Sequence, residues 1–392
     1  MSRSISRRTV MKGFSVGAVA AAGGLGFPSI LKAEDEIKVG FIGPISGFYA
    51  LQGADMLQST ELAVDEINQQ GAAGGRKLKL FVEDNKLEPK ASIDAARKLI
   101  HRDEVDVIIG VLASSSRVAA LSVTEPADQL FIYPTFYEGG ECRRNLIVTG
   151  TVPNQSVDPT VPWLIENVGK RIYVVGNDFE YPRGMAALIK AAAEQHGGQY
   201  VGEEFYPFGT SEYGPIFQRI KEASPDVVWV MDAGQPVMVQ QYHQFGMEPQ
   251  LFASILHENW TTKTEGAAEG VLANASYFTS VDTPENKKFL ANYRARFGDD
   301  IYPTTFGESQ YDSVWLYAKA VAKAGSADQD QVRKAITEVD FLGPQGRINV
   351  VAHNQHARTN SIIGRVNKAG LIDIVKEFGQ VDPNVPGCNL AT

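Results

Sequence analysis

The stretch that decides the fold is residues 37–71, IKVGFIGPISGFYALQGADMLQSTELAVDEINQQG. Residues 37–42 form a short apolar run that ends at the turn residues Gly43 and Pro44, which predicts a strand. Over residues 56–68 apolar side chains recur at helical spacing, and Gly71 follows as a stop signal. A strand followed by a helix is the repeating unit of α/β proteins.

The same alternation runs along most of the chain. Further strands are expected at 77–83, 105–112, 129–133, 145–148, 171–176, 200–206, 227–231 and 251–254, with helices at 92–101, 185–196, 213–223 and 237–245. Strands that alternate with helices imply parallel sheets with right-handed crossovers. Because the rhythm restarts near residue 171, we predict two doubly wound α/β lobes. The last third predicts helices at 283–297, 311–324 and 331–339, and antiparallel strands at 347–351, 361–366 and 372–378.

Residues 1–33 have the layout of an export signal. They contain basic residues and no acid, and an apolar stretch over residues 13–27 is too short for a membrane span, which takes about 20 residues. The order of basic, apolar and polar parts predicts a signal peptide cleaved after Ala33. The segment Ser6-Arg7-Arg8-Thr9-Val10-Met11-Lys12 resembles the twin-arginine export motif. We therefore expect the mature protein in the periplasm.

Composition excludes several classes of function. The 392 residues include 37 Lys and Arg against 46 Asp and Glu, a net charge of −9 without a basic tract, which does not suit nucleic-acid binding. Two cysteines cannot form a disulfide-rich scaffold or a zinc site of four thiolates. In an oxidising compartment, Cys142 and Cys388 are expected either to pair or to remain two buried thiols.

Motifs for catalysis or cofactor binding are missing from the sequence. A GxSxG string at residues 13–17 lies in the export signal, and the chain has no phosphate loop, no strand-borne GxGxxG and no HExxH. His353 and His356 have a metal-like spacing, but a solvated turn between strands is expected there. We therefore predict no cofactor, no metal and no enzymatic activity.

Hydroxyl and aromatic residues follow the predicted strands, which is where an open α/β sheet binds its ligand. These clusters are 43–50, 113–116, 134–139, 177–183, 232–235 and 256–260. None is rich in Lys or Arg, so we expect a small neutral or zwitterionic polar ligand and not a phosphate. A helix that begins at the three serines would offer backbone N–H groups to a carbonyl or carboxylate, although serines also act as ordinary helix caps.

Several of these segments resemble one family of transport proteins. Gly43-Pro44-Ile45-Ser46-Gly47 and residues 63–68 (AVDEIN) resemble the type I periplasmic solute-binding proteins of branched-chain amino-acid-type ABC importers. Residues 133–139 (YPTFYEG), 153–155 (PNQ), 176–183 (GNDFEYPR) and 280–284 (SVDTP) resemble the branch that binds urea and short-chain amides. The likeness extends over residues 37–378 in the same order.

The resemblance implies a fold of two Rossmann-like lobes joined by three crossovers, with a ligand cleft that closes about a hinge. Crossovers near Gly150, Ser276 and Gly343 would give a first lobe of residues 36–150 and 277–343, and a second lobe of residues 151–276 and 344–380. Residues 381–392 would be a loose C-terminal tail.

The resemblance also implies a ligand site. Ser114, Tyr133 and Thr135 would line the wall of the first lobe, and Phe179, Tyr181, Gln235 and Glu258 that of the second. Ser114 and Thr135 would donate hydrogen bonds to a carbonyl, and Glu258 would accept from NH2 groups. The chain departs from the amide-binding pattern at Phe179, a tyrosine in relatives, and at Phe136, a Pro or Gln in relatives. Residues 256–260 also depart from the acidic run of urea binders.

We thus predict a receptor that delivers urea or a short amide to the permease subunits of an ABC importer. A longer amide, or a branched-chain or other amino acid, is the alternative ligand within the family. An amide-sensing regulatory protein of the same fold is an alternative of another class, against which the export signal argues. An exported hydrolase is a third class, which no motif supports.

Overall fold

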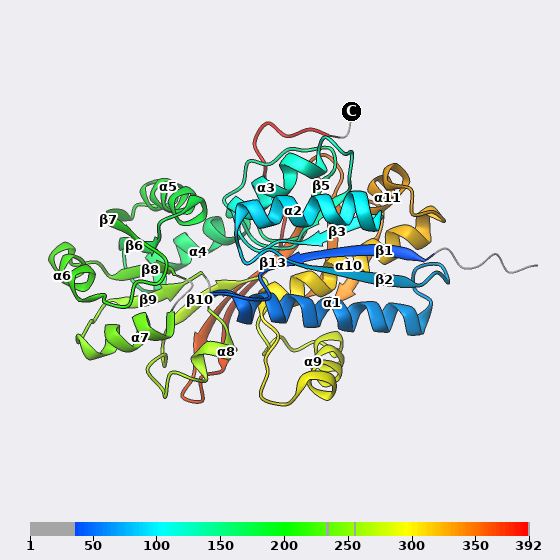
Figure 1. Ribbon diagram of the computed structural model, residues 1–392. Coiled ribbons are helices and arrows are strands. Elements are labelled where there is room, and N and C mark those ends of the chain that lie inside the picture. Colours follow the sequence, from blue (N-terminus) through cyan, green and yellow to red (C-terminus); the bar gives the residue numbers. More distant parts are fainter. Residues whose placement is uncertain (1–35, 233–234, 255, 391–392) are drawn as a thin grey trace, which may run out of the picture. The chain divides into compact units, whose positions relative to one another are not determined.

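The computed structural model describes residues 36–232, 235–254 and 256–390. Its strands form one fourteen-stranded sheet with two sets of parallel strands, which are the centres of the two lobes (Figure 1). In the first lobe the strands are β1 (Ile37–Gly43), β2 (Leu78–Asp84), β3 (Val107–Gly110), β4 (Phe131–Tyr133) and β5 (Leu146–Val148). In the second lobe they are β6 (Arg171–Asn177), β7 (Gln199–Tyr206), β8 (Val227–Met231), β9 (Gln250–Ala253) and β10 (Leu272–Ala275).

Both sets have the same topology. The spatial order is β2-β1-β3-β4-β5 in the first lobe and β7-β6-β8-β9-β10 in the second. Each is the order 2-1-3-4-5 of a doubly wound sheet, in which the strand order reverses beside the first strand. The predicted fold class of two doubly wound lobes is confirmed.

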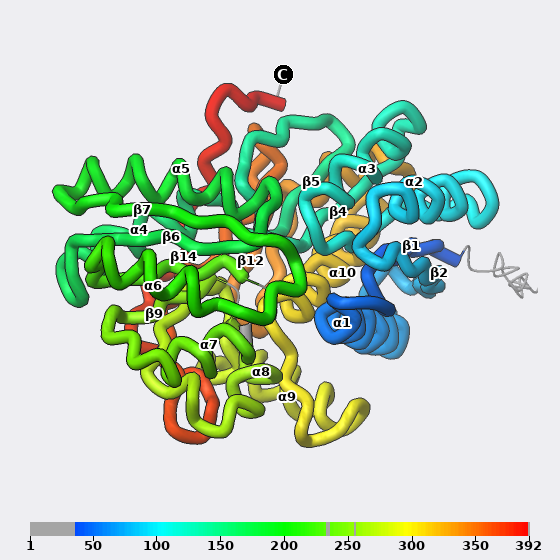
Figure 2. Tube along the Cα trace, turned by 60° about the vertical axis from the view of Figure 1, so that its left-hand side comes forward, coloured from blue at the N-terminus to red at the C-terminus, as the bar shows by residue number. Residues whose placement is uncertain are grey.

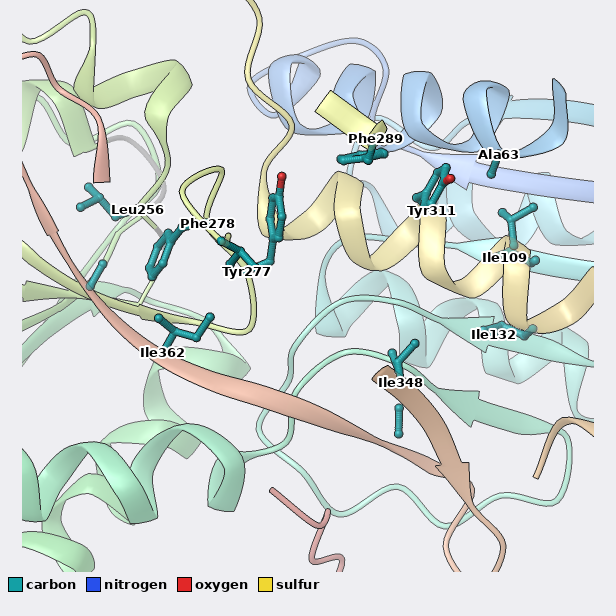
Figure 3. Packing of buried hydrophobic residues seen from close by; sticks show 14 of the residues in the cluster. Ala63, Ile109, Ile132, Leu256, Tyr277, Phe278, Phe289, Tyr311, Ile348 and Ile362 are labelled. Atoms are coloured by element: carbon teal, nitrogen blue, oxygen red, sulfur yellow. The ribbon is translucent and has the colours of Figure 1, made fainter. Parts of the chain in front are cut away.

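Helices cover both faces of the sheet in the first lobe. They are α1 (Ala50–Gln70), α2 (Pro89–Lys98), the π-helical turn η1 (Leu99–Asp103), α3 (Ser114–Thr124), α9 (Pro284–Phe297), α10 (Thr305–Ala324) and α11 (Gln329–Ile336). Alternate residues of β3 face opposite ways: Val107 and Ile109 pack in one buried cluster with α1 and α10, and Ile108 packs in another with α2 and α3. Figure 3 shows the first of these clusters, in which Tyr311 of α10 lies near Phe289.

The second lobe repeats this arrangement. Its helices are α4 (Pro153–Asn167), α5 (Glu180–Gln195), α6 (Gly214–Ala223), α7 (Gln235–Gln244) and α8 (Glu258–Thr261). Val174 on β6 joins a buried cluster with α4 and α5, and its neighbour Val175 joins another cluster with α6 and α7. Helix α4 was not expected from the sequence, because Pro159 and Pro162 lie inside it and both normally disfavour a helix interior.

The antiparallel strands at the end of the chain join the lobes. They are β11 (Asp340–Gly343), β12 (Gly346–Val351), β13 (His356–Val366) and β14 (Ile372–Val381). Strand β13 begins beside β5 and β12 of the first lobe and continues beside β10 of the second. The third passage between lobes therefore lies within β13. The boundary expected near Gly343 is a hairpin turn between β11 and β12 instead, because a Gly-Pro turn signal does not distinguish a hairpin from a crossover.

The expectation of a loose tail over residues 381–392 is wrong for its described part. After β14 the chain returns to the first lobe (Figure 2). There Cys388 forms a disulfide with Cys142, and the Leu390 N–H donates to the carbonyl of His353. The expected solvated turn is wrong for His356, which is buried and lies within hydrogen-bond distance of the Tyr137 hydroxyl, at 2.7 Å. Among residues 36–390 that the structure describes, no helix is long and apolar enough to cross a membrane. The predicted export signal lies outside the described residues.

Candidate functional site

A cavity between the lobes opens at the carboxyl ends of the strands. Its volume is about 40 Å3. The lining residues are Tyr49, Gln52, Leu87, Leu112, Ala113, Ser114, Thr135, Phe136, Phe179, Tyr181, Phe208 and Phe306. Most follow closely on β3, β4, β6 or β7, so the cavity lies at the carboxyl ends of the parallel strands of both lobes.

Aromatic rings make up half of the lining and touch one another across the lobes. Phe136 of the first lobe lies 5.0 Å from Tyr181 of the second and 5.1 Å from Phe306, between ring centroids. Phe179 lies 5.1 Å from Phe208, which in turn lies 5.9 Å from Tyr49. These distances are those of favourable aromatic pairs. The rings therefore close the cavity with a largely apolar wall.

The hydroxyl of Ser114 is fixed by a buried charged network. Ser114 Oγ donates to Glu138 over 2.6 Å and accepts from the Arg117 guanidinium over 3.2 Å. Arg117 also pairs with Glu138 and Glu141, and its guanidinium carbon lies 4.4 Å from the ring centre of Tyr137. Since the hydroxyl hydrogen is committed to Glu138, Ser114 presents only a lone pair to a ligand.

The hydroxyl hydrogen of Thr135 is likewise used in a hydrogen bond within the protein. Thr135 Oγ1 donates to the carbonyl of Val111 over 3.0 Å. Val111 has a φ of 71°, a left-handed conformation that is strained for a β-branched residue. The Val111 N–H also donates to the Ile42 carbonyl over 2.6 Å, so the N–H and the carbonyl of this strained residue are both hydrogen-bonded. Thr135 thus shapes the loop that carries Leu112 to Ser114, and its own lone pairs remain for a ligand.

Hydrogen-bond donors come from the first turn of α3. Its N-cap residue is Ala113, which offers no side-chain cap, so the serines do not cap the helix as they could have done. The first N–H groups of a helix have no partner within it, and they carry the positive end of the helix dipole. Ala113 and Ser114 border the cavity, which places these donors at its edge. Gln52 adds a buried side-chain amide whose Oε1 has no hydrogen-bond partner.

The cavity brings together four of the seven predicted site residues, namely Ser114, Thr135, Phe179 and Tyr181. Tyr133 lies behind the wall: its hydroxyl donates to the Leu112 carbonyl over 3.1 Å, and burial raises its pKa to about 12. Glu258 also lies outside the lining, where it accepts from the N–H and hydroxyl of Thr279, and burial raises the pKa of its carboxyl. Gln235 is the first residue of α7, and its side chain lies outside the described part of the structure.

The other lining residues are not among the predicted ligand contacts. Tyr49 and Phe136 lie in the expected strand-end segments, where an aromatic residue close to a hydroxyl residue indicates a ligand contact. Phe208 follows β7 and Leu87 follows β2, so strand ends alone would have indicated them. Gln52 and Phe306 lie in the first turns of α1 and α10, for which the sequence offers no comparable signal. The described residues contain no group of three or more His, Cys, Asp or Glu side chains placed to hold a metal ion.

Comparison with known proteins identifies the class that this fold and cavity define. Residues 37–385 match the model of the periplasmic binding protein domain, so the chain belongs to the periplasmic binding protein family. It is 25% identical over 331 residues to the leucine-, isoleucine-, valine-, threonine- and alanine-binding protein of Pseudomonas aeruginosa, covering 82% of this chain and 88% of that one. It is 26% identical to the Leu/Ile/Val-binding protein BraC3 of Rhizobium johnstonii, covering 78% and 84%.

Solved structures are similar in fold. An ABC transporter solute-binding protein of Rhodopseudomonas palustris BisB5, solved with 3,4-dihydroxybenzoic acid, has a TM-score of 0.81 at 25% identity and covers 90% of this chain and 99% of that one. The leucine-binding protein LivK of Thermotoga maritima has a TM-score of 0.78 at 20% identity, with 88% and 99% covered. The expected family is thereby confirmed. The ligands of these relatives are chemically diverse, which leaves the ligand of this chain to be argued from its own cavity.

Proposed function

We propose that this protein is the solute receptor of an ABC importer and that its ligand is a short carboxamide with an apolar substituent. The observation that carries the proposal is the polarity of the cavity lining. Ser114 and Thr135 have committed their hydroxyl hydrogens to Glu138 and Val111, and Gln52 Oε1 has no partner. These three side chains therefore offer acceptors, and the first turn of α3 offers donors. A primary amide supplies the complement of both, with two N–H donors and one carbonyl acceptor.

The absence of charge from the lining favours a neutral ligand over an amino acid. None of the twelve described lining residues is acidic or basic. Glu138 and Asp232 lie outside the lining, and each already accepts two hydrogen bonds from protein groups. An amino-acid ammonium group buried here would lack a carboxylate of its own, and an unpaired buried charge is costly.

The aromatic walls favour an apolar substituent. Burial of each methylene contributes about 0.8 kcal/mol, so butyramide should bind about tenfold more tightly than acetamide. Urea has no apolar substituent and buries no methylene. We therefore expect it to bind more weakly than the alkyl amides.

A small aromatic carboxylate is the second candidate. The first turn of α3 suits a carboxylate as well as a carbonyl, and six aromatic rings surround the space beside it. The relative of Rhodopseudomonas palustris solved with a dihydroxybenzoate has the same fold. The acceptors of Ser114, Thr135 and Gln52 count against benzoate itself, which has no hydrogen-bond donor, whereas a hydroxybenzoate would donate to them through its hydroxyls.

Thermal shift followed by titration calorimetry tests the proposal with five compounds: urea, acetamide, butyramide, leucine and benzoate. A ligand at 100 times its Kd adds about 2.7 kcal/mol of stability. The proposal expects binding of butyramide, then acetamide, then urea, in order of falling affinity. Binding of leucine or benzoate with no response to any amide would overturn it. Recovery of unchanged butyramide after long incubation is expected of a receptor, whereas release of ammonia would indicate a hydrolase.

We further propose that the twin-arginine segment exports the protein to the periplasm. The support is the order of charges in residues 1–33 and membership of a family of periplasmic proteins. Replacing both Arg7 and Arg8 by Lys should leave the unprocessed protein in the cytoplasm on cell fractionation. Unchanged processing of that variant would point to another export route.

A further inference from the structure

A second cavity lies behind the wall of the first. Its volume is about 20 Å3, and it shares Phe136 and Tyr181 with the ligand cavity. Its remaining lining is different in kind, with seven hydroxyl or amide side chains and no charged residue. These seven are Tyr137, Thr151, Ser156, Ser254, Asn274, Ser276 and Thr305. A largely apolar cavity and a more polar one are thus separated by two aromatic side chains.

The hydrogen bonds inside this compartment leave it richer in acceptors than in donors. Ser156 Oγ donates to the Pro153 carbonyl over 3.2 Å, and the Asn274 amide donates to Ser361 and Ile362 over 3.2 Å. Ser276 and Thr305 bond to each other over 3.0 Å. Lone pairs on these oxygens remain, so the compartment suits an uncharged group that donates hydrogen bonds, such as a hydroxyl or a primary amide.

The two dividing rings differ in how they are held. Tyr181 contacts Phe179 as well as Phe136, with ring centroids 6.4 and 5.0 Å apart, and Ser254 beside it in the lining accepts from the Trp229 indole over 2.6 Å. Phe136 is held by ring contacts with Tyr181 and Phe306. Its backbone is positioned independently, because Gly150 packs so closely that a Cβ there would lie 2.6 Å from the Phe136 nitrogen. Removing the Phe136 ring should therefore open the divider and leave the chain in place.

We propose that Phe136 sets the maximum length of the ligand and that the compartment behind it is a subsite for an uncharged, hydrogen-bond-donating end of a longer ligand. This inference rests on the proposed amide-binding function. In the protein as it stands, the ring stops the apolar substituent at the wall. Without the ring, an extended molecule reaches from the first turn of α3 into the hydroxyl-lined compartment.

The test compares the full protein with its Phe136→Ala variant on three amides: butyramide, hexanamide and adipamide, the six-carbon diamide. Adipamide and hexanamide have the same chain length and differ only in the far end. We expect Phe136→Ala to bind adipamide at least tenfold more tightly than the unmodified protein does, with a smaller gain for hexanamide. Phe306→Ala is the matched control, because Phe306 lines the first cavity and contacts Phe136 but does not line the second. It should favour hexanamide over adipamide.

Two results overturn the inference. One is adipamide affinity in Phe136→Ala no higher than in the unmodified protein. The other is a crystal structure of the variant in which Tyr181 or the backbone has filled the space, with two cavities still separate. The binding of butyramide to the unmodified protein is the arm that tests the proposed function alone. If butyramide binds the unmodified protein but Phe136→Ala gains no affinity for adipamide, only the proposed role of Phe136 fails. If no amide binds the unmodified protein, the proposed function itself fails.

Discussion

The ring of Tyr49, in the first lobe, stands edge-on to the ring of Phe208, in the second, with centroids 5.9 Å apart. Phe208 also lies 5.1 Å from Phe179 and is 42% exposed, so it forms the outer end of the aromatic wall. The contact with Tyr49 joins the two lobes at the entrance of the cavity. It can form only while the lobes are together.

Phe208→Ala is expected to weaken ligand binding by accelerating dissociation. An aromatic pair contributes about 0.5–1.5 kcal/mol beyond its buried area, so the dissociation rate should rise about 2–10-fold while the association rate changes little. Stopped-flow or surface plasmon resonance measures both rates. Phe245→Ala is the matched control, since Phe245 is similarly exposed at 48% and packs on Phe217 away from the cavity. Equal dissociation rates in the two variants would contradict a role in closure.

Thr135→Ala should lower affinity about tenfold and cost a modest amount of stability. The change removes an acceptor from the cavity and leaves the buried Val111 carbonyl without its donor, which costs about 1–3 kcal/mol. Thr135→Ser keeps the hydroxyl and should restore most of both properties. Titration calorimetry and guanidinium chloride unfolding measure the two effects. Full affinity in Thr135→Ala would remove Thr135 from the site.

Acid should destabilise the protein through His356. Its Nδ1 lies 2.6 Å from the Asn354 carbonyl, which assigns the proton to Nδ1, and Nε2 then accepts from the Tyr137 hydroxyl. Burial lowers the pKa of His356 from 6.5 to about 4. As the pH falls, the unfolded chain therefore binds the proton before the folded protein does. The stability that neutral His356 contributes is complete above pH 6.5 and is lost as the pH falls to about 4. That shift corresponds to about 3 kcal/mol.

Guanidinium chloride unfolding at several pH values measures this contribution. His356→Gln cannot take up the proton, so the difference in unfolding free energy between the unmodified protein and the variant should shrink as the pH falls from 6.5 to 4. His353→Gln is the control, because His353 is exposed three residues away. Parallel pH profiles for the unmodified protein and His356→Gln would exclude His356 as the titrating group.

Loss of the disulfide between Cys142 and Cys388 should lower stability without changing ligand affinity. The two cysteines are 246 residues apart, and closing a long loop typically stabilises a protein by about 2–4 kcal/mol. The double variant with both cysteines replaced by Ser should melt at a lower temperature and bind the ligand as before. A reductant should lower the melting temperature of the unmodified protein and leave the variant unaffected. An equal shift in melting temperature for the unmodified protein and the variant would show that the disulfide does not contribute to stability.

The fold could be predicted because its signals are local and repeated. The strand at residues 37–42 and the helix that follows repeat in kind along the chain, and the doubly wound class follows from that alternation. The third passage between lobes could not be predicted, because β13 is one uninterrupted strand and its change of neighbour leaves no mark on its sequence. The order of the tail depends on Cys142, which is distant in sequence, so local composition gave no indication of it.

The candidate site was predictable only to the level of strand ends. Thr135 lies past the end of β4 and lines the cavity, whereas Tyr133 is still within the strand and packs with Phe131 towards α3. Glu258 follows β9 as expected, but its carboxylate points to Thr279. The sequence indicates which residues follow a strand. The direction of a side chain depends on neighbours that only the folded chain brings together.

Strand β13 has a consequence for how the molecule melts. Its first residues pair with β12 and β5, its last with β10 and β14, and the backbone between is continuous. Unfolding the sheet of either lobe would break hydrogen bonds of β13, so neither lobe can unfold and leave the other intact. Heating should therefore give one cooperative transition, with equal calorimetric and van't Hoff enthalpies, although the molecule has two lobes.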